Sequence, residues 1–328
     1  MLPPPRAMPV AVVGAGVSGL SCAAALSEAP REHKVEVYEA DESHVGGRLR
    51  QTQTRAWPVE LGAQFVHGTD GEASKGLLQA LEKAGQKQVR SIPWPDACWS
   101  AEGGWRRAEA DAALKGAESA MENLDGALSS ASVAHALAAQ SQATLAMASA
   151  VYANDYGTDL SRLGAAAVAS ELAAWESGED YGVLTGEDAR KTNANWSALV
   201  KSLSDSLTIK RGARLVRVSH WQEGDSQPLM LHFEDGQTVK AEVAVIALPL
   251  TVLREGDVVF DPPLPAWKTR AWCVMQMDNC LKVRFQVANK ANQLHPDEDT
   301  LQTILVRTIR RCLSRWLWRQ VFQFKESR

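Results

Sequence analysis

The apolar residues near the start of the chain predict alternating strands and helices. Residues 10–13 form a short apolar run that leads directly into a glycine-rich turn, and residues 20–26 then have helical character. A second strand-like run follows at residues 34–38. Strand, tight turn, helix and strand in this order are typical of the first unit of an α/β domain with a Rossmann-like sheet.

Three glycines, Gly14, Gly16 and Gly19, lie between the first strand and the helix. In a dinucleotide-binding turn, the first glycine permits the sharp bend and the second lets the backbone approach a pyrophosphate. The third lets the helix pack closely on the strand. The helix N-terminus adds free N–H groups and a partial positive charge. A glycine turn of purely structural use is the alternative until its context is considered.

Glu39, which ends the second strand-like run, supplies that context. At this interval a carboxylate can accept hydrogen bonds from both ribose hydroxyls of a dinucleotide. The simpler interpretation is a surface glutamate at a strand end. Because the strand, the glycines and the acid follow one another in the order and at the spacing of a dinucleotide-binding unit, we predict a dinucleotide site.

The rest of the pattern predicts a helical segment followed by further strands. Residues 74–85 have apolar positions at helical spacing, and prolines among tryptophans at residues 93–105 indicate a loop that bends over the site. Core packing of those tryptophans is the alternative to substrate contact. Residues 109–175 are rich in alanine and predict several packed helices. Strand-like alternation returns in three later segments, residues 214–221, 229–233 and 243–247.

Composition and charge narrow the class of protein. The 328 residues are 45% hydrophobic, and a net charge of −4 with a pI near 6.0 argues against a nucleic-acid binder. Five scattered cysteines without a Cys-x-x-Cys pair indicate reduced thiols and a cytoplasmic location, and seven histidines without ligand spacing predict no metal site. No apolar run has the length of a membrane span, and the first eight residues lack a secretory signal, so we expect no stable membrane insertion.

A second glycine pair follows Glu39, in the sequence Val45-Gly46-Gly47-Arg48. It suits another close approach of backbone to phosphate, with a guanidinium beside it. Residues 59–68 then read Val-Glu-Leu-Gly-Ala-Gln-Phe-Val-His-Gly. This succession resembles the flavin-dependent amine oxidase family, and within it the polyamine and spermine oxidases. A nicotinamide dehydrogenase would not be expected to need the last two motifs.

The resemblance implies an FAD cofactor and an α/β fold in two discontinuous parts. A Rossmann-like FAD-binding domain would comprise residues 8–90 and 193–262, and a largely helical substrate domain residues 91–192 and 263–328. Both glycine turns and the backbone beside the adenine would hold the cofactor, through Gly14, Gly16, Gly19, Glu39, Gly46, Gly47, Arg48 and Val216.

The same resemblance implies three catalytic residues. Gln64 and His67 would line the substrate side of the flavin ring, and Lys282 would hold a water beside flavin N5. A lysine within the apolar run 279–285 needs a partner, because burial disfavours its charge. A strand-edge lysine that reaches solvent is the alternative for Lys282. For His67 the alternative is a histidine of the core.

The end of the chain departs from the family pattern. Residues 304–328 are basic and aromatic-rich. Family members continue well beyond this point and supply a Gly-Glu segment to the FAD pyrophosphate, which we do not find in residues 1–328. A helix of this composition can lie on an anionic membrane or bind a partner. The irregular end of a truncated chain is the other interpretation. We therefore expect residues 1–328 alone to hold FAD weakly.

As a whole, the resemblance implies an FAD-dependent oxidoreductase that acts on a small-molecule, polyamine-like amine. Hydride transfer to flavin N5 would give an imine and, with O₂, hydrogen peroxide. Two alternatives stay open: a truncated, non-catalytic relative that acts as a binding module, and another flavoprotein of the same wider fold, such as a desaturase or a histone demethylase. The polyamine-like loop at residues 64–68 argues against the second.

Overall fold

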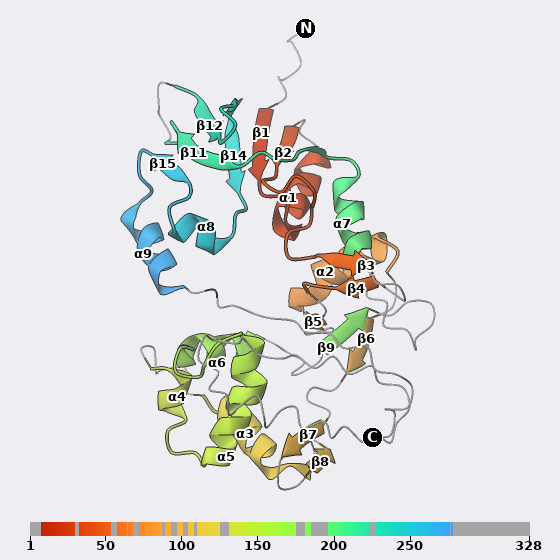
Figure 1. Ribbon diagram of the computed structural model, residues 1–328, viewed down its shortest axis with the longest axis vertical. Coiled ribbons are helices and arrows are strands. Elements are labelled where there is room, and N and C mark those ends of the chain that lie inside the picture. The colour runs from red at the N-terminus through yellow and green to blue at the C-terminus, as the bar shows by residue number, and fades with distance from the viewer. Residues whose placement is uncertain are drawn as a thin grey trace, which may run out of the picture. The chain divides into compact units, whose positions relative to one another are not determined.

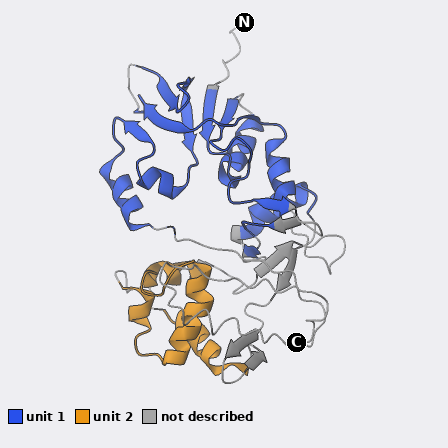
Figure 2. Cartoon of the chain, in the orientation of Figure 1, with its two compact units in different colours: residues 1–93, 179–277 blue, residues 94–178, 278–328 orange. Residues whose placement is uncertain are grey.

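The computed structural model describes residues 8–29, 33–53, 58–63, 65–67, 72–86, 89–92, 97–100, 104–107, 110–124, 131–174, 181–184, 196–222, 227–275 and 277. The chain divides into two compact units, Met1–Pro93 with Glu179–Met277, and Trp94–Gly178 with Asp278–Arg328 (Figure 2). The first unit contains the expected parallel sheet and the second contains the alanine-rich helices. The finer domain boundaries that the family resemblance implies stay a prediction.

A four-stranded parallel sheet forms the centre of the first unit (Figure 1). β1 (Met8–Val13) pairs with β2 (His33–Tyr38) on one side and with β14 (Val243–Ile246) on the other, and β10 (Thr208–Lys210) pairs with β2 at the edge. Helix α1 (Val17–Ser27) connects β1 to β2. Because the chain continues on opposite sides of β1, the sheet has a switch point there, and in open parallel sheets ligands bind at the carboxyl ends of such strands.

β1 is buried on both faces, which accounts for its unbroken apolar sequence. Val10 and Val12 share a core with Leu20 of α1. Ala11 and Val13, which point to the other face, belong to a core that the parallel sheet shares with a second sheet. The helix and the second sheet therefore fix the carboxyl end of β1 from both sides.

The second sheet has the strand order β13 (Thr238–Ala241), β12 (Leu229–Phe233), β11 (Leu215–Ser219) and β15 (Val259–Asp261). β12 pairs antiparallel with both β11 and β13, and Gly236, with a φ of 86°, lies in the turn between β12 and β13. Tyr38 stacks on Phe233 with ring centroids 4.9 Å apart. This contact joins the two sheets at the residue that precedes Glu39.

Smaller elements complete the first unit. Helix α2 (Glu72–Lys83) begins and ends two residues earlier than the sequence indicated, and Gly85, with a φ of 80°, follows it. Leu81 of this helix shares a core cluster with Leu199. The elements are β3 (Gln51–Gln53), β4 (Pro58–Glu60), β5 (Phe65–His67), α2 (Glu72–Lys83), β6 (Val89–Ile92), β9 (Tyr181–Leu184), α7 (Trp196–Ser204), α8 (Leu250–Arg254) and α9 (Ala266–Val274).

The second unit contains the helices that its alanine-rich sequence predicts. They are α3 (Ala112–Glu122), α4 (Val133–Ala136), α5 (Gln142–Ala148), the π-helical turn η2 (Ser149–Ala153) and α6 (Ala165–Ala174). Asp111, Ser132 and Ser141 cap the first three helices, because each side chain accepts a hydrogen bond from a backbone N–H in the first turn. None of the helices in the described part of the chain has the length and apolar character of a membrane span.

A strand pair precedes these helices, within the segment where the sequence indicated a loop. β7 (Ala97–Ser100) pairs antiparallel with β8 (Gly104–Arg107), and Trp99 lies opposite Trp105 in the register. Aromatic residues favour strands, and the prolines that suggested a loop come before β7 in the sequence.

Candidate cofactor site

Packing requires glycine at two of the three positions after β1. Gly14 has a φ of 101°, and a Cβ atom there would lie 2.5 Å from the carbonyl oxygen of Ala247. A Cβ atom on Gly19 would lie 1.9 Å from the carbonyl oxygen of Gly14. Both contacts are with backbone atoms, which cannot move aside as a flexible side chain can. These two glycines therefore serve the sharp turn and the close helix–strand contact.

Gly16 differs from both of them. It is the N-cap of α1, its φ of −70° is open to any residue, and a Cβ atom there would meet nothing within 4 Å. No side chain among the described residues caps the helix N-terminus. The first N–H groups of α1 and the positive end of its dipole are therefore available beside open space, where a phosphate group fits.

The backbone orients the carboxylate of Glu39. Its Oε2 accepts a hydrogen bond from Ala15 N at 2.7 Å, and its Oε1 accepts one from Asp41 N at 2.9 Å. Since a carboxylate has about four acceptor positions, each oxygen keeps a lone pair for a ribose hydroxyl. The main chain of Glu39 is also held, because its N donates to Lys210 O and its O accepts from Ala213 N. The acid is fixed relative to the glycine turn.

The second glycine turn lies directly against the first. Gly46 has a φ of 113° and its N donates to Ala15 O at 2.8 Å. A Cβ atom on Gly47 would lie 3.1 Å from the Cα of Gly16. The two turns thus form one glycine-lined surface. Arg48, which follows it, is exposed and forms no ion pair with another described residue, so its guanidinium is available to an anion.

The loop that leads to Gln64 begins on this same turn. Leu61 N donates to Arg50 O at 2.7 Å, and Ala63 N donates to Arg48 O at 3.3 Å. A Cβ atom on Gly62 would lie 1.6 Å from the carbonyl oxygen of Arg48. Only glycine permits this approach, so the Leu-Gly-Ala motif is explained by backbone packing against the second glycine turn.

Glu60 anchors the start of that loop. The side chain is buried, and its Oε1 accepts hydrogen bonds from Gln51 Nε2 at 2.9 Å and from Trp196 N at 3.3 Å. The carboxylate thus joins the β3–β4 hairpin to the first turn of α7, where the helix dipole favours a negative charge. Glu60 and Trp196 are 136 positions apart, so the sequence carried no local signal for this contact.

Glu36 forms a second polar cluster close to Glu39 that the sequence did not single out. Its Oε2 accepts hydrogen bonds from the Tyr38 hydroxyl at 2.7 Å and from Lys210 Nζ at 2.9 Å. These bonds lower the pKa of Glu36 to about 2. Burial and the bond to Glu36 raise the pKa of Tyr38. The cluster holds β10 on β2, and therefore holds the Lys210 carbonyl that binds Glu39 N.

The structure brings together both glycine turns, Glu39 and Arg48, and their contacts with a cofactor stay a prediction. Val216 lies in β11, a few residues after Ala213, and its contact with an adenine stays a prediction. Gln64 and Lys282 lie outside the described residues, and only the backbone of His67, in β5, is described. No group of three or more metal-binding side chains occurs within the described ranges.

Comparisons with known proteins identify the family of the chain. The sequence pattern of the family described as flavin containing amine oxidoreductase matches residues 17–319. The chain is 25% identical over 278 residues to polyamine oxidase 4 of Oryza sativa subsp. japonica, across 80% of this chain and 55% of that protein. It is also 25% identical over 305 residues to the peroxisomal N(1)-acetyl-spermine/spermidine oxidase of Homo sapiens, across 80% of this chain and 58% of that protein.

A solved structure of a putrescine oxidase bound to putrescine has the same fold, with a TM-score of 0.61 at 21% identity, over 81% of this chain and 63% of that one. The chain spans 55% and 58% of the length of the two curated relatives above. The family pattern nevertheless covers most of the chain, since it matches residues 17–319. The match begins at the first residue of α1 and includes Glu39 and the second glycine turn. The chain therefore belongs to the flavin-containing amine oxidoreductase family, whose cofactor is a flavin.

Proposed function

We propose that this protein oxidises an amine of the polyamine class. The reaction removes a hydride from the carbon beside the amine nitrogen and a proton from that nitrogen, which leaves an imine. Water then hydrolyses the imine to a carbonyl compound and an amine or ammonia. FAD would be held by the two glycine turns and Glu39, and it would supply the redox chemistry by taking up the hydride and passing two electrons, with two protons, to O₂ to give hydrogen peroxide. The observation that carries the proposal is the cradle of two touching glycine turns beside Glu39, which fits the adenosine diphosphate half of FAD.

The described residues contribute binding and orientation. The N-terminus of α1 at Gly16 favours the pyrophosphate, Glu39 accepts the ribose hydroxyls, and Arg48 adds a positive charge beside the phosphates. Because the backbone already holds Glu39 and both turns in place, little binding free energy is spent on ordering them.

We assign the substrate side to Gln64, His67 and Lys282. In support, Leu61 and Ala63 bind the backbone beside the second glycine turn, so the chain enters the segment with Gln64 and His67 from the cofactor cradle. Lys282 would hold a water near the reacting carbon, and a lysine suits this task because its three N–H donors can orient a water. The substrate amine has to be neutral to release a hydride, so an adjacent proton acceptor favours the reaction.

The names of the relatives support the polyamine class. Two of them are oxidases of polyamines or their acetylated forms, and the structural neighbour holds putrescine. These amines share an aliphatic chain with a second amino or amide nitrogen several carbons from the first. We therefore expect putrescine, spermidine, spermine or an N-acetyl derivative to be oxidised faster than a monoamine.

The test titrates residues 1–328 with FAD by calorimetry and measures peroxide release with each amine while saturating FAD is present. The proposal expects saturable FAD binding and peroxide release that depends on a polyamine. A stable protein that binds no FAD in the titration would refute it in favour of a binding module. Bound flavin without peroxide from any amine would refute amine oxidation and leave the cofactor site intact.

A further inference from the structure

The loop of residues 39–50 keeps two cofactor contacts at a fixed separation. It begins with Glu39, includes the second glycine turn, and runs between the end of β2 at Tyr38 and the start of β3 at Gln51 without helix or strand. A segment of this length samples many conformations unless its own contacts hold it. The geometry of the cradle therefore depends on what fixes this loop.

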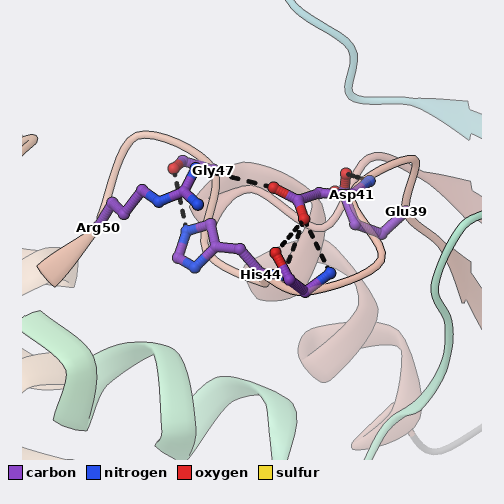
Figure 3. A network of polar contacts seen from close by, with 6 residues as sticks. Glu39, Asp41, His44, Gly47 and Arg50 are labelled. Carbon is purple, nitrogen blue, oxygen red and sulfur yellow. Dashed lines mark hydrogen bonds and ion pairs between the residues drawn. The ribbon is translucent and has the colours of Figure 1, made fainter. Parts of the chain in front are cut away.

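Asp41 makes most of the side-chain contacts in the loop (Figure 3). Its Oδ1 accepts hydrogen bonds from Ser43 N and Ser43 Oγ, both at 2.8 Å, and from His44 N at 3.0 Å. Its Oδ2 lies 3.8 Å from Arg50 Nη1. One side chain thus ties together positions at the start, middle and end of the loop.

The same network reaches the cofactor residues on both sides. Asp41 N donates to Glu39 Oε1 at 2.9 Å, so the turn at Asp41 helps to aim the ribose carboxylate. His44, whose N–H binds Asp41, has its Nε2 3.2 Å from Gly47 O in the second glycine turn. Asp41 is therefore the link between the ribose contact and the second phosphate contact.

We propose that Asp41 is a positioning residue for the adenosine diphosphate half of FAD. It holds residues 39–50 so that the carboxylate of Glu39 and the Gly46–Gly47 turn keep the separation that ribose and pyrophosphate require. The inference rests on the FAD site and not on the proposed amine oxidation.

The contacts of Asp41 differ in strength, which makes the inference specific. The side chains of Arg50 and Asp41 are 52% and 37% exposed, and an ion pair between exposed groups at 3.8 Å contributes little. The three hydrogen bonds to Oδ1, at 2.8, 2.8 and 3.0 Å, have ordinary hydrogen-bond lengths and hold the loop instead. What the loop needs is an acceptor oxygen at this position, which asparagine keeps and alanine lacks.

The experiment measures the affinity of ADP for the 328-residue chain by calorimetry. ADP carries the adenine, ribose and pyrophosphate but no flavin ring, so the readout does not depend on turnover. Asp41→Ala should weaken ADP binding by about tenfold, since the loop loses its internal acceptor. Asp41→Asn should stay within about twofold of the unaltered chain. The backbone N–H to Glu39 remains in both variants.

Asp235 provides a matched control. Its Oδ1 accepts a hydrogen bond from Gln237 N at 2.9 Å, in the exposed turn between β12 and β13. Asp235→Ala therefore removes the same kind of side-chain-to-backbone bond from a turn of the second sheet. Its ADP affinity should equal that of the unaltered chain, whereas its melting temperature should fall, as a purely structural role predicts.

A double-mutant cycle with Glu39→Gln shows whether Asp41 acts through the carboxylate. If it does, Asp41→Ala costs less in the Glu39→Gln background than in the unaltered chain. A full, additive loss in both backgrounds would overturn the proposal, and so would Asp41→Ala binding ADP as well as Asp235→Ala does.

Ser43→Ala covers the case in which Asp41→Ala does not fold. It removes one of the three bonds to Oδ1 and leaves Asp41 in place, so ADP affinity should fall about two- to threefold. An unchanged affinity would count against the proposal. If the unaltered chain binds no ADP at all, the cofactor site itself is wrong, and the inference fails with it.

Discussion

Replacing Gly16 by alanine separates a cofactor role of the glycine turn from a structural one. In this structure a Cβ atom on Gly16 meets nothing within 4 Å, and the φ of −70° suits alanine. Glycine-to-alanine changes at compatible positions stabilise a protein by about 0.4–1 kcal/mol, because they restrict the unfolded chain. The ligand-free Gly16→Ala variant should therefore melt at the same temperature as the unaltered chain or slightly higher.

The same methyl group should weaken ligand binding. A phosphate oxygen that accepts a charge-assisted hydrogen bond lies about 2.7–2.9 Å from the backbone nitrogen, and a carbon atom beside Gly16 would keep the phosphate from this approach. Loss of one such bond costs about 1.5–3 kcal/mol, which is about ten- to a hundredfold in affinity. Titration with ADP and with FAD measures this loss directly.

Gly19→Ala is the structural counterpart. Its Cβ atom would lie 1.9 Å from the carbonyl oxygen of Gly14, so α1 has to shift on β1. Helix propensity returns about 1 kcal/mol at most, whereas overpacking against backbone costs about 1–3 kcal/mol or more. The melting temperature should fall. If Gly16→Ala binds ADP normally, or loses as much stability as Gly19→Ala, the reasoning about the turn is refuted.

Three further outcomes are expected. Glu39→Ala should weaken FAD by about 2–4 kcal/mol, since two charge-assisted hydrogen bonds are lost; flavin retention after dialysis that matches the unaltered chain would contradict this. His67→Ala should leave the bound-flavin spectrum intact and lower amine turnover, and a variant that simply unfolds would favour a core histidine. For Glu36 the folded pKa of about 2 lies below its ordinary value of 4.5. Its contribution to stability is therefore complete above pH 4.5 and is lost as the pH falls toward 2. Between pH 4.5 and pH 2, the melting temperature of Glu36→Gln should therefore fall less steeply with decreasing pH than that of the unaltered chain. Equal slopes would show that the cluster does not contribute to this pH dependence.

The glycine turn could be predicted because its determinants are local. A strand that runs into Gly14, a helix that starts after Gly16 and an acid at Glu39 are all visible within one stretch of sequence. What the sequence could not supply is the neighbour that makes Gly14 necessary, since Ala247 comes from the other end of the first unit. Ala247 reaches Gly14 because β14, which ends at Ile246, pairs with β1 in the sheet.

Two of the polar contacts that sequence analysis missed, at Glu36 and at Glu60, are long-range in sequence. Lys210 binds Glu36 across 174 positions, and no periodicity within either strand shows that β10 and β2 are neighbours. Asp41 was overlooked for a different reason. An aspartate in a polar loop is common, and only the simultaneous contacts with Ser43, His44 and Arg50 distinguish it.

The cofactor cradle combines segments that precede the helical unit in the sequence with segments that follow it. The glycine turns come before residues 94–178, whereas Lys210, Ala213 and Ala247 come after them. Glu39 is held by the later segment at both its N and its O, so the ribose contact forms only when β10 has docked on β2. None of these contacts involves α3 to α6. Substitutions on those helices should therefore leave ADP affinity unchanged, because the contacts of the cofactor cradle and the core of the helical unit involve separate sets of residues.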